Sequence, residues 1–342
     1  MTDEAADWQL LSLAPVAPER VEAWFEGIAG LRVTFPAERT PAAVRAAIGA
    51  ADIVLSDWSS ALRVDAAEVA AASRLAFLMS PSVGLDNIDL EALTAGGVIV
   101  ANTAGLNAPS VAEWCFGAAF AVARSLAWVD GRVRAGDWPQ FEFPERGSTE
   151  VAGLRVGVVG FGAVGSRVAA LFRAIGCDVA YWTRNRRPSE DERGAAWLPL
   201  ADLAARSDVL VVNVSLATET RGLVGAAVLA ELPRGAILID ASRGAVVDHV
   251  ALLGAIETGR LRGAAIDVFE HEPLPLDSPL RRSDRILLSS HAAATTGQAM
   301  ARIFARVGDN VRRAVAGEPI RSVVIGLGPV ATRRGPGRRA AG

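Results

Sequence analysis

The sequence predicts an α/β protein built from two doubly wound, parallel-sheet domains. Short runs rich in Ile, Val and Leu alternate with Ala-rich segments along residues 8–101, the pattern of buried parallel strands joined by helices. A second series of the same kind extends from Leu154 to His291. At 342 residues the chain is longer than one core usually fills, so we expect two domains.

The first series contains five candidate strands and at least one well-marked helix. A helix is predicted over Pro41–Gly49, because Thr40 can cap it and Pro41 suits the first turn. The strand candidates are Gln9–Leu13, Leu31–Phe35, Ile53–Leu55, Leu75–Met79 and Val98–Ala101.

Three segments lie outside this strand-helix alternation. A long helix is predicted to begin at Ser110, because Glu113 three residues later would complete a capping box. Residues 130–151 hold aromatic residues and prolines without periodicity, so we expect irregular structure there. The Gly- and Arg-rich segment 326–342 is predicted to be disordered and solvated.

Composition excludes several classes of function. The net charge of -3 argues against non-specific nucleic-acid binding, which depends on neutralising phosphates. The longest apolar helix candidate, Val111–Ala123, is too short to cross a bilayer of about 30 Å, so no membrane association is expected. The acidic start is unlike a signal peptide, which favours a cytoplasmic protein.

Cys115 and Cys177 are predicted to be buried thiols. The chain contains no lysine, which excludes Schiff-base chemistry.

A glycine-rich turn predicts a dinucleotide site. The candidate strand Arg155–Val159 leads into a G-x-G-x-x-G sequence, and a helical segment, Ser166–Ile175, follows. The first glycine permits a tight turn, the second lets backbone N–H groups approach a pyrophosphate, and the third allows close helix packing. We expect cofactor contacts from Gly160, Phe161, Gly162, Ala163, Val164 and Gly165.

The end of the next strand, Asp178–Trp182, indicates which cofactor is preferred. An acidic residue there would bind the ribose hydroxyl of NAD, but the sequence continues Thr183-Arg184-Asn185-Arg186-Arg187. Arginine can pair with a 2′-phosphate through a two-pronged contact. NADP(H) is therefore favoured, with NAD(H) as the alternative and Arg184 as the leading phosphate ligand. The other interpretation is a solvated basic loop.

Arg243, Glu272 and His291 each follow a short apolar run that reads as a buried strand. Ligands of open α/β sheets bind outside the carboxyl ends of the strands, so these side chains are candidates for one active site. Taken singly, such residues are more often structural or solvated. The remaining histidines, His249 and His271, lack metal-ligand spacing, so no metal site is expected.

In these motifs the chain resembles the D-isomer-specific 2-hydroxyacid dehydrogenases over roughly residues 50–325. The matching segments are Val83–Asp89, Asn102–Asn107, Ser110–Glu113, Gly160–Gly165, Glu219–Leu223, Ser242–Gly244, Asp267–Pro273 and Ser290–His291. The resemblance implies a flavodoxin-like substrate-binding domain (1–103 and 294–325), a Rossmann domain (104–293), a cleft between them, and a homodimer.

The resemblance also implies roles for the three side chains. Arg243 would bind the carboxylate and carbonyl oxygen of the substrate. His291 would exchange a proton with the substrate oxygen as hydride moves to or from a nicotinamide. Glu272 would hold the imidazole and favour its protonated form. Because formate dehydrogenases of this superfamily have glutamine at the position of Glu272, the glutamate favours a 2-oxo acid.

Further contacts are implied with less direct support. A first substrate loop would supply the N–H groups of Ser82, Val83 and Gly84, and the serine, where many members have glycine, should stiffen this loop. Trp138 would enter the substrate pocket of a partner subunit or anchor the dimer interface. The remaining cofactor contacts that we expect are Thr183, Arg184, Asn185, Arg186, Ser215, Ala241 and Asp267.

The expected activity is interconversion of a small 2-oxo acid and its D-2-hydroxy acid, as an NADPH-dependent reductase of glyoxylate or hydroxypyruvate. One alternative is an NAD-linked dehydrogenase of a bulkier D-2-hydroxy acid. Another is a dinucleotide-sensing interaction protein similar to the corepressors of the family.

Overall fold

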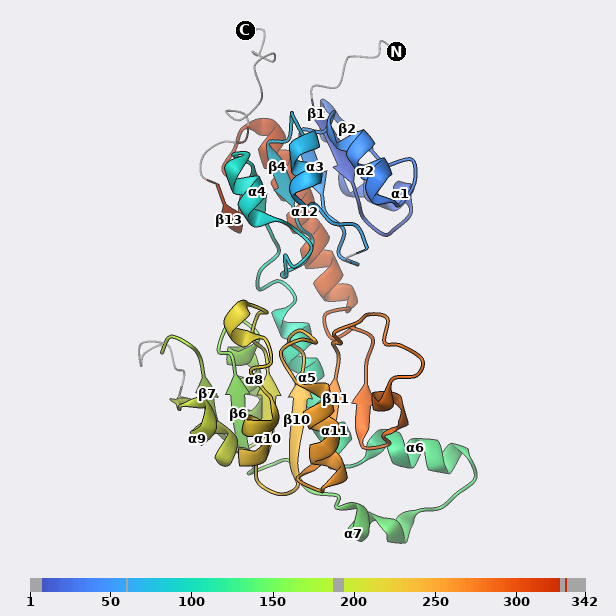
Figure 1. Ribbon diagram of the computed structural model, residues 1–342, viewed down its shortest axis with the longest axis vertical. Helices are drawn as coiled ribbons and strands as arrows, with labels where there is room; N and C mark the ends of the chain where they lie inside the picture. The colour runs from blue at the N-terminus through green and yellow to red at the C-terminus, as the bar shows by residue number, and fades with distance from the viewer. Residues whose placement is uncertain (1–7, 60, 187–193, 327–329, 331–342) are drawn as a thin grey trace. The chain divides into compact units, whose positions relative to one another are not determined.

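The computed structural model describes residues 8–59, 61–186, 194–326 and Val330. The chain divides into two compact units, Met1–Asn107 with Gly297–Gly342, and Ala108–Thr296. Each unit is an α/β layer structure around its own sheet (Figure 1), which confirms the predicted fold class. Most of the segment predicted to be disordered, residues 326–342, lies outside the described residues.

The first unit has a six-stranded sheet in the order β13-β5-β4-β3-β1-β2. The order 2-1-3-4-5 of its parallel strands is that of flavodoxin-like folds, and β13 adds an antiparallel edge strand beside β5. The strands are β1 (Trp8–Ser12), β2 (Leu31–Thr34), β3 (Ile53–Leu55), β4 (Phe77–Met79), β5 (Ile99–Ala101) and β13 (Val323–Ile325).

Helices cover both faces of this sheet. Residues of α1 and α12 pack into one apolar cluster, and residues of α2 and α4 pack into the other. The predicted cap of α2 is confirmed, because the Thr40 hydroxyl accepts a hydrogen bond from the Ala43 N–H at 3.2 Å. The helices are α1 (Pro18–Trp24), α2 (Pro41–Ile48), α3 (Ala66–Ala71), α4 (Leu90–Ala95) and α12 (Gly297–Ala316).

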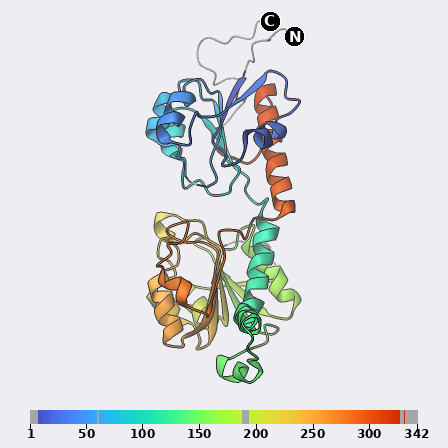
Figure 2. The same cartoon turned by 90° about the vertical axis from the view of Figure 1, so that its right-hand side faces the viewer.

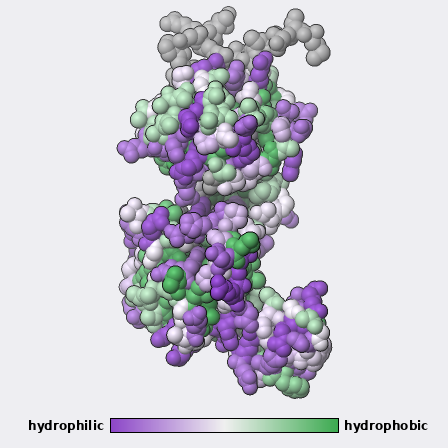
Figure 3. Space-filling view, turned by 45° about the vertical axis from the view of Figure 1, so that its right-hand side comes forward, coloured by the Kyte–Doolittle hydropathy of each residue, from purple (hydrophilic) through white to green (hydrophobic). Residues whose placement is uncertain are grey.

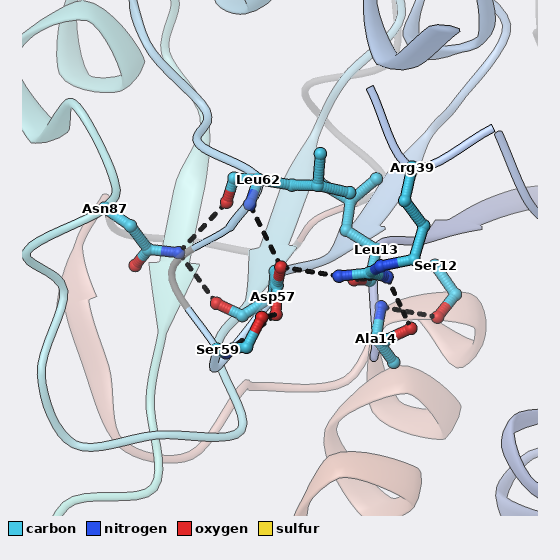
Figure 4. A network of polar contacts seen from close by, with 8 residues as sticks. All are labelled: Ser12, Leu13, Ala14, Arg39, Asp57, Ser59, Leu62 and Asn87. Carbon is cyan, nitrogen blue, oxygen red and sulfur yellow. Dashed lines mark hydrogen bonds and ion pairs between the residues drawn. The ribbon is translucent and has the colours of Figure 1, made fainter. Parts of the chain in front are cut away.

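A buried carboxylate fastens the loops at the carboxyl ends of β1 and β3 (Figure 4). Asp57, 1% exposed, accepts hydrogen bonds from the Arg39 guanidinium at 2.7 Å, the Leu62 N–H at 3.0 Å, and the N–H and hydroxyl of Ser59. Arg39 also donates to two carbonyl oxygens after β1. The network pairs a buried charge with a cation and three further donors, as a buried carboxylate requires.

The second unit has a seven-stranded parallel sheet in the order β12-β11-β10-β9-β6-β7-β8. The order reverses between β6 and β9, which is the switch point of a Rossmann-type sheet. The strands are β6 (Arg155–Val159), β7 (Asp178–Trp182), β8 (Ala196–Trp197), β9 (Val209–Val212), β10 (Ala236–Asp240), β11 (Leu261–Ile266) and β12 (Ile286–Leu288).

Two groups of helices enclose this sheet (Figure 2). α5 (Ala108–Ala123) and α8 (Gly165–Ala174) pack on one face. α9 (Leu200–Ala205), α10 (Ala226–Glu231) and α11 (His249–Glu257) pack on the other. The remaining helical segments of the described residues are α6 (Leu126–Arg134), η1 (Gln140–Glu142), α7 (Phe143–Arg146), η3 (Thr218–Thr220) and η4 (Pro279–Arg282).

Two local predictions are wrong. α5 begins at Ala108, not at Ser110, since Pro109 already suits the first turn; the Ser110 hydroxyl instead pairs with that of Thr296 at 2.8 Å. Residues 130–151, predicted to be irregular, include the end of α6, η1 and α7. Ion pairs of Arg132 with carboxylates five and ten residues later stabilise that segment.

Both cysteines are unpaired and buried, as predicted. Within the described ranges, none of the helices combines the length and apolar character that a membrane span requires.

Candidate active site

The glycine-rich sequence forms a turn between β6 and α8, at the switch point of the sheet. Gly160 has φ of 96°, a left-handed conformation that favours glycine. A Cβ atom on Gly165 would overlap the carbonyl oxygen of Gly160, so this position also requires glycine. The turn therefore brings the N-terminus of α8 close against the end of β6.

Gly162 differs, because a Cβ atom there would meet nothing within 4 Å. Protein packing does not demand glycine at this position, and open space beside a helix N-terminus is what a dinucleotide pyrophosphate needs. The first turn of α8 contains no acidic residue, so the helix N-terminus favours an anion. The turn thus fits a bound dinucleotide. The Phe161 side chain, 1% exposed, stacks on Tyr181 in the core, which leaves only its backbone for the cofactor.

The basic segment after β7 lies at the next strand end. Arg184 Nη1 lies 3.5 Å from Glu219 Oε1, and both side chains are exposed. The Thr183 hydroxyl donates to the Asn185 carbonyl at 2.7 Å, and the Arg186 guanidinium lies over the Trp197 ring at 6.0 Å. Arg187 lies outside the described residues. The segment carries no carboxylate of its own, but Glu219 competes for Arg184.

Arg243, Glu272 and His291 follow three adjacent strands, β10, β11 and β12. His291 Nδ1 lies 2.8 Å from Glu272 Oε2. The other oxygen of Glu272 accepts the Phe269 N–H at 2.9 Å. The Arg243 guanidinium is oriented by the preceding residue, because its Nη1 donates to the Ser242 carbonyl at 2.9 Å. The structure thus forms the predicted Glu–His pair at the edge where the sequence placed it.

Electrostatics keep Glu272 ionised. Partial burial alone would raise its pKa, but the hydrogen bonds from His291 and the Phe269 N–H, with the charge of Arg243, outweigh it and lower the pKa below its usual range. An ionised carboxylate at Nδ1 orients the imidazole and leaves Nε2 for proton transfer.

Asp267 fixes the loop that carries the imidazole. Its carboxylate accepts the N–H groups of Ala292 at 2.8 Å and Ala293 at 3.0 Å, and its carbonyl accepts the His291 N–H at 2.7 Å. His291 has φ of 56°, a region that few residues other than glycine adopt without surrounding support. Asp267, expected from the sequence as a cofactor contact, here supplies that support.

Comparison with known proteins identifies the family that has this geometry. The family model described as "D-isomer specific 2-hydroxyacid dehydrogenase, NAD binding domain" matches residues 116–293, just over half of the chain. This chain belongs to the D-isomer specific 2-hydroxyacid dehydrogenase family.

Named relatives of this dehydrogenase family differ in substrate. The chain is 36% identical over 254 residues to a glyoxylate reductase of Aeropyrum pernix. That alignment covers 73% of this chain and 76% of the relative. It is 38% identical over 274 residues to a D-3-phosphoglycerate dehydrogenase of Mycobacterium leprae, covering 80% of this chain but 51% of the relative. The chain therefore spans about half the length of the phosphoglycerate dehydrogenase.

A solved structure supports the same dehydrogenase fold. The holo form of Rhodotorula graminis D-mandelate dehydrogenase superposes with a TM-score of 0.86 at 22% identity, covering 94% of this chain and 99% of that one. At that identity the likeness concerns the fold alone. By its family model, the chain has an NAD-binding domain of the D-isomer specific 2-hydroxyacid dehydrogenase type.

Sequence reasoning missed two polar residues of this dehydrogenase site. Asp240 ends β10 and is fully buried, and its Oδ1 accepts the N–H and hydroxyl of Ser242 at 3.0 and 2.5 Å. Asn213 follows β9, and its Oδ1 lies 3.8 Å from the Cys115 sulfur. In the described chain Asp240 Oδ2 and Asn213 Nδ2 are buried without hydrogen-bond partners. Their position at strand ends could have identified them.

The first substrate loop lies in the other unit, after β4. The Ser82 hydroxyl donates to the Gly84 carbonyl at 2.8 Å and lies 3.0 Å from the Ser80 hydroxyl. Asn102 Nδ2 donates to the Val83 carbonyl at 3.0 Å. The serine hydroxyl is thus used within the loop, as a stiffened loop requires. Binding of substrate by this loop stays a prediction.

The other predicted contact residues are placed as follows. Trp138 is 76% exposed, and its Nε1 donates to Gln140 Oε1 at 3.4 Å. The Ser215 carbonyl accepts the Thr220 hydroxyl at 2.8 Å, and the Ala241 N–H donates to a carbonyl of β9. Within the parts of the chain that the structure describes, no group of His, Cys, Asp and Glu could hold a metal ion.

Proposed function

We propose that this enzyme reduces a small 2-oxo acid to its D-2-hydroxy acid with NADPH, with glyoxylate or hydroxypyruvate as the substrate. The observation that carries the proposal is the 2.8 Å contact between His291 Nδ1 and Glu272 Oε2, beside Arg243 on the adjacent strand end. When bound, the nicotinamide supplies or accepts the hydride.

The chain itself binds the substrate and moves the proton. The planar guanidinium of Arg243 holds the carboxylate and polarises the carbonyl oxygen. His291 Nε2 donates the proton to that oxygen, while Glu272 at Nδ1 stabilises the imidazolium before transfer. Binding of the substrate by the N–H groups of Ser82, Val83 and Gly84 is part of the proposal and rests on the family resemblance alone. In the oxidative direction the imidazole takes the proton back.

The preference for NADPH is proposed from the segment after β7. Arg184 offers a fork for a 2′-phosphate, and its ion pair with Glu219, at 3.5 Å, is solvent-exposed and therefore weak. Thr183, Asn185 and Arg186 would add polar contacts. Measuring kcat/KM with both cofactors tests this, and Arg184→Ala should raise the KM for NADPH while leaving that for NADH unchanged. A tenfold preference of the wild type for NADH would refute it.

The acid/base assignment is tested with a matched pair of histidine variants on neighbouring loops. His291→Asn should lower kcat by about 10²–10⁴-fold while retaining cofactor binding. His271→Asn is the control, because His271 is exposed and only one residue from Glu272. Full turnover in His291→Asn would exclude His291 as the acid/base.

A panel of 2-oxo acids tests the substrate. Glyoxylate and hydroxypyruvate should give the highest kcat/KM, and phenylpyruvate a lower one. Faster turnover of the bulky acid with NADH would favour the dehydrogenase of a larger D-2-hydroxy acid. Tight NADPH binding without turnover of any acid would favour a dinucleotide sensor.

We also propose that the enzyme is a homodimer whose interface includes Trp138, because this large side chain is 76% exposed and aromatic residues of this kind are enriched at interfaces. Sedimentation analysis of the wild type and Trp138→Ala tests it. A cytoplasmic location stays a prediction.

A further inference from the structure

Three arginines meet at the amino-terminal edge of the second unit's sheet, the edge opposite to His291. Arg262 is the second residue of β11, Arg285 directly precedes β12, and Arg146 ends α7. All three line one small pocket with Trp128 and Asp284. Figure 1 shows α6 and α7 near the amino-terminal ends of the strands, where the arrows begin. We name Arg146, Arg262 and Arg285 the arginine cluster.

The cluster is separate from the catalytic edge. β11 has six residues, and a strand rises about 3.3 Å per residue, so the two edges are about 17 Å apart. An ion bound here would not touch a substrate held by Arg243.

Two of these arginines are held in fixed positions. The Arg146 side chain is 10% exposed; its guanidinium lies 4.2 Å from the centre of the Trp128 ring and donates to the carbonyl and carboxylate of Asp284 at 2.7 and 3.0 Å. Arg285 Nη1 donates to the carbonyls of Arg262 at 3.2 Å and Arg146 at 3.5 Å. These contacts, with the burial of the Arg146 side chain, hold both guanidinium groups at the pocket.

Donors of the cluster remain unused. Arg262 Nη1 and Arg146 Nε are buried, and within the described ranges neither has a hydrogen-bond partner. Burial and the nearby charge of Arg285 both lower the pKa of Arg262. The one carboxylate that contacts the three guanidinium groups in the described ranges is Asp284, on Arg146. Three like charges with one counter-charge and buried unpaired donors destabilise a fold unless an anion joins them.

We propose that the arginine cluster binds a small oxyanion of the phosphate type. Guanidinium groups match tetrahedral and planar oxyanions through paired N–H···O bonds, and the anion would satisfy both Arg262 Nη1 and Arg146 Nε. The unpaired N–H groups are buried below the surface, which suits a small ion better than a carboxylate docked from a second protein. The surface of the part of the unit that holds α6 and α7 carries many hydrophilic residues (Figure 3).

Inorganic phosphate is the probe, and thermal unfolding of the enzyme is the readout. The enzyme is saturated with NADPH, which fills the phosphate-binding turn at Gly160–Gly165, and ionic strength is kept constant with chloride. Phosphate should raise the Tm of the wild type in a saturable manner. Titration calorimetry should give one site per chain under the same conditions.

Arg262→Met separates this proposal from a structural role. Without phosphate this variant should unfold at a higher Tm than the wild type, because it removes an unpaired, partly buried charge. Its affinity for phosphate should fall at least tenfold. Arg20→Met is the matched control, because it removes the same charge from an exposed position on α1 and should keep the wild-type response. Arg262→Gln repeats the test with a polar side chain if the methionine variant misfolds.

Three results would overturn the proposal. Phosphate affinity in Arg262→Met or Arg262→Gln equal to that of the wild type would move the bound ion elsewhere. No saturable effect of phosphate on the wild type would leave the cluster without an oxyanion. A change of oligomeric state in Arg262→Met, with no phosphate effect on the wild type, would assign the cluster to contact with a second copy.

Discussion

Replacing Asp240 with asparagine should make the protein more stable at alkaline pH. Asp240 is fully buried at the end of β10. Its Oδ1 accepts two hydrogen bonds from Ser242, but its Oδ2 is buried and has no partner in the described chain. Burial raises its pKa to about 7 from an ordinary 3.8; the charge of Asp267 adds to the effect, and Ser242 and Arg243 oppose it.

The sign follows from linkage. The native state holds the proton more tightly than the unfolded state, so stability is highest when the carboxyl is protonated in both states. It falls as pH rises from 3.8 and becomes constant above about 7. At about 1.4 kcal/mol per pKa unit, the whole shift of about 3 units corresponds to about 4 kcal/mol. Asparagine keeps one acceptor for Ser242 and carries no charge, so it avoids this loss.

Urea unfolding of Asp240→Asn and the wild type at pH 5 and pH 8 measures the difference. The free energy of unfolding of the variant, relative to the wild type, should rise by about 2–3 kcal/mol between these values. Asp202→Asn, at an exposed position on α9, serves as the control and should show the pH dependence of the wild type. The reasoning is refuted if Asp240→Asn and the wild type change in parallel with pH.

Three further predictions concern a pair of glycines and two carboxylates. Gly165→Ala should destabilise the fold, because its methyl group would overlap a backbone oxygen of the turn. Gly162→Ala has open space around the new methyl group, so it should fold normally and bind NADPH more weakly. Thermal unfolding and cofactor titration distinguish the two variants. Asp57→Ala should lower the free energy of unfolding by about 3–5 kcal/mol, because it leaves the buried partners of a charge unpaired; equal urea midpoints would contradict this. Because the pKa of Glu272 is lowered, its carboxylate stays ionised down to mildly acidic pH. Glu272→Gln should reduce kcat about tenfold or more at pH 7. The pH–rate profile of the variant should lack the acidic limb that protonation of the carboxylate gives the wild type.

The sheets could be predicted from the sequence because the central residues of buried strands are apolar. The bounds expected for β3, β6 and β7 are those of the structure, and the central residues of each are buried. The strand ends then located the Glu272–His291 pair, since all strands of the second sheet run parallel and their carboxyl ends share one edge.

Partners distant in sequence could not be predicted in the same way. Ser110 has a local pattern that suits a cap, but its hydroxyl pairs with Thr296, 186 residues away. Asp57 receives donors from Arg39 before it and Leu62 after it, and neither spacing is periodic. Such contacts depend on which loops the tertiary fold brings together, so local propensity gives no signal for them.

The carboxylates at the carboxyl edge of the second sheet are tied to backbone. Asp267 accepts two N–H groups of the loop after β12, Asp240 one from the loop after β10, and Glu272 one from its own loop. Each carboxylate therefore sets the path of a loop, and Glu272 has one oxygen left for His291. Backbone N–H groups stabilise the negative charges of these carboxylates. Arg243 and His291 are therefore the side chains whose charge can act on an anionic substrate. This arrangement favours a carboxylate substrate over a neutral alcohol.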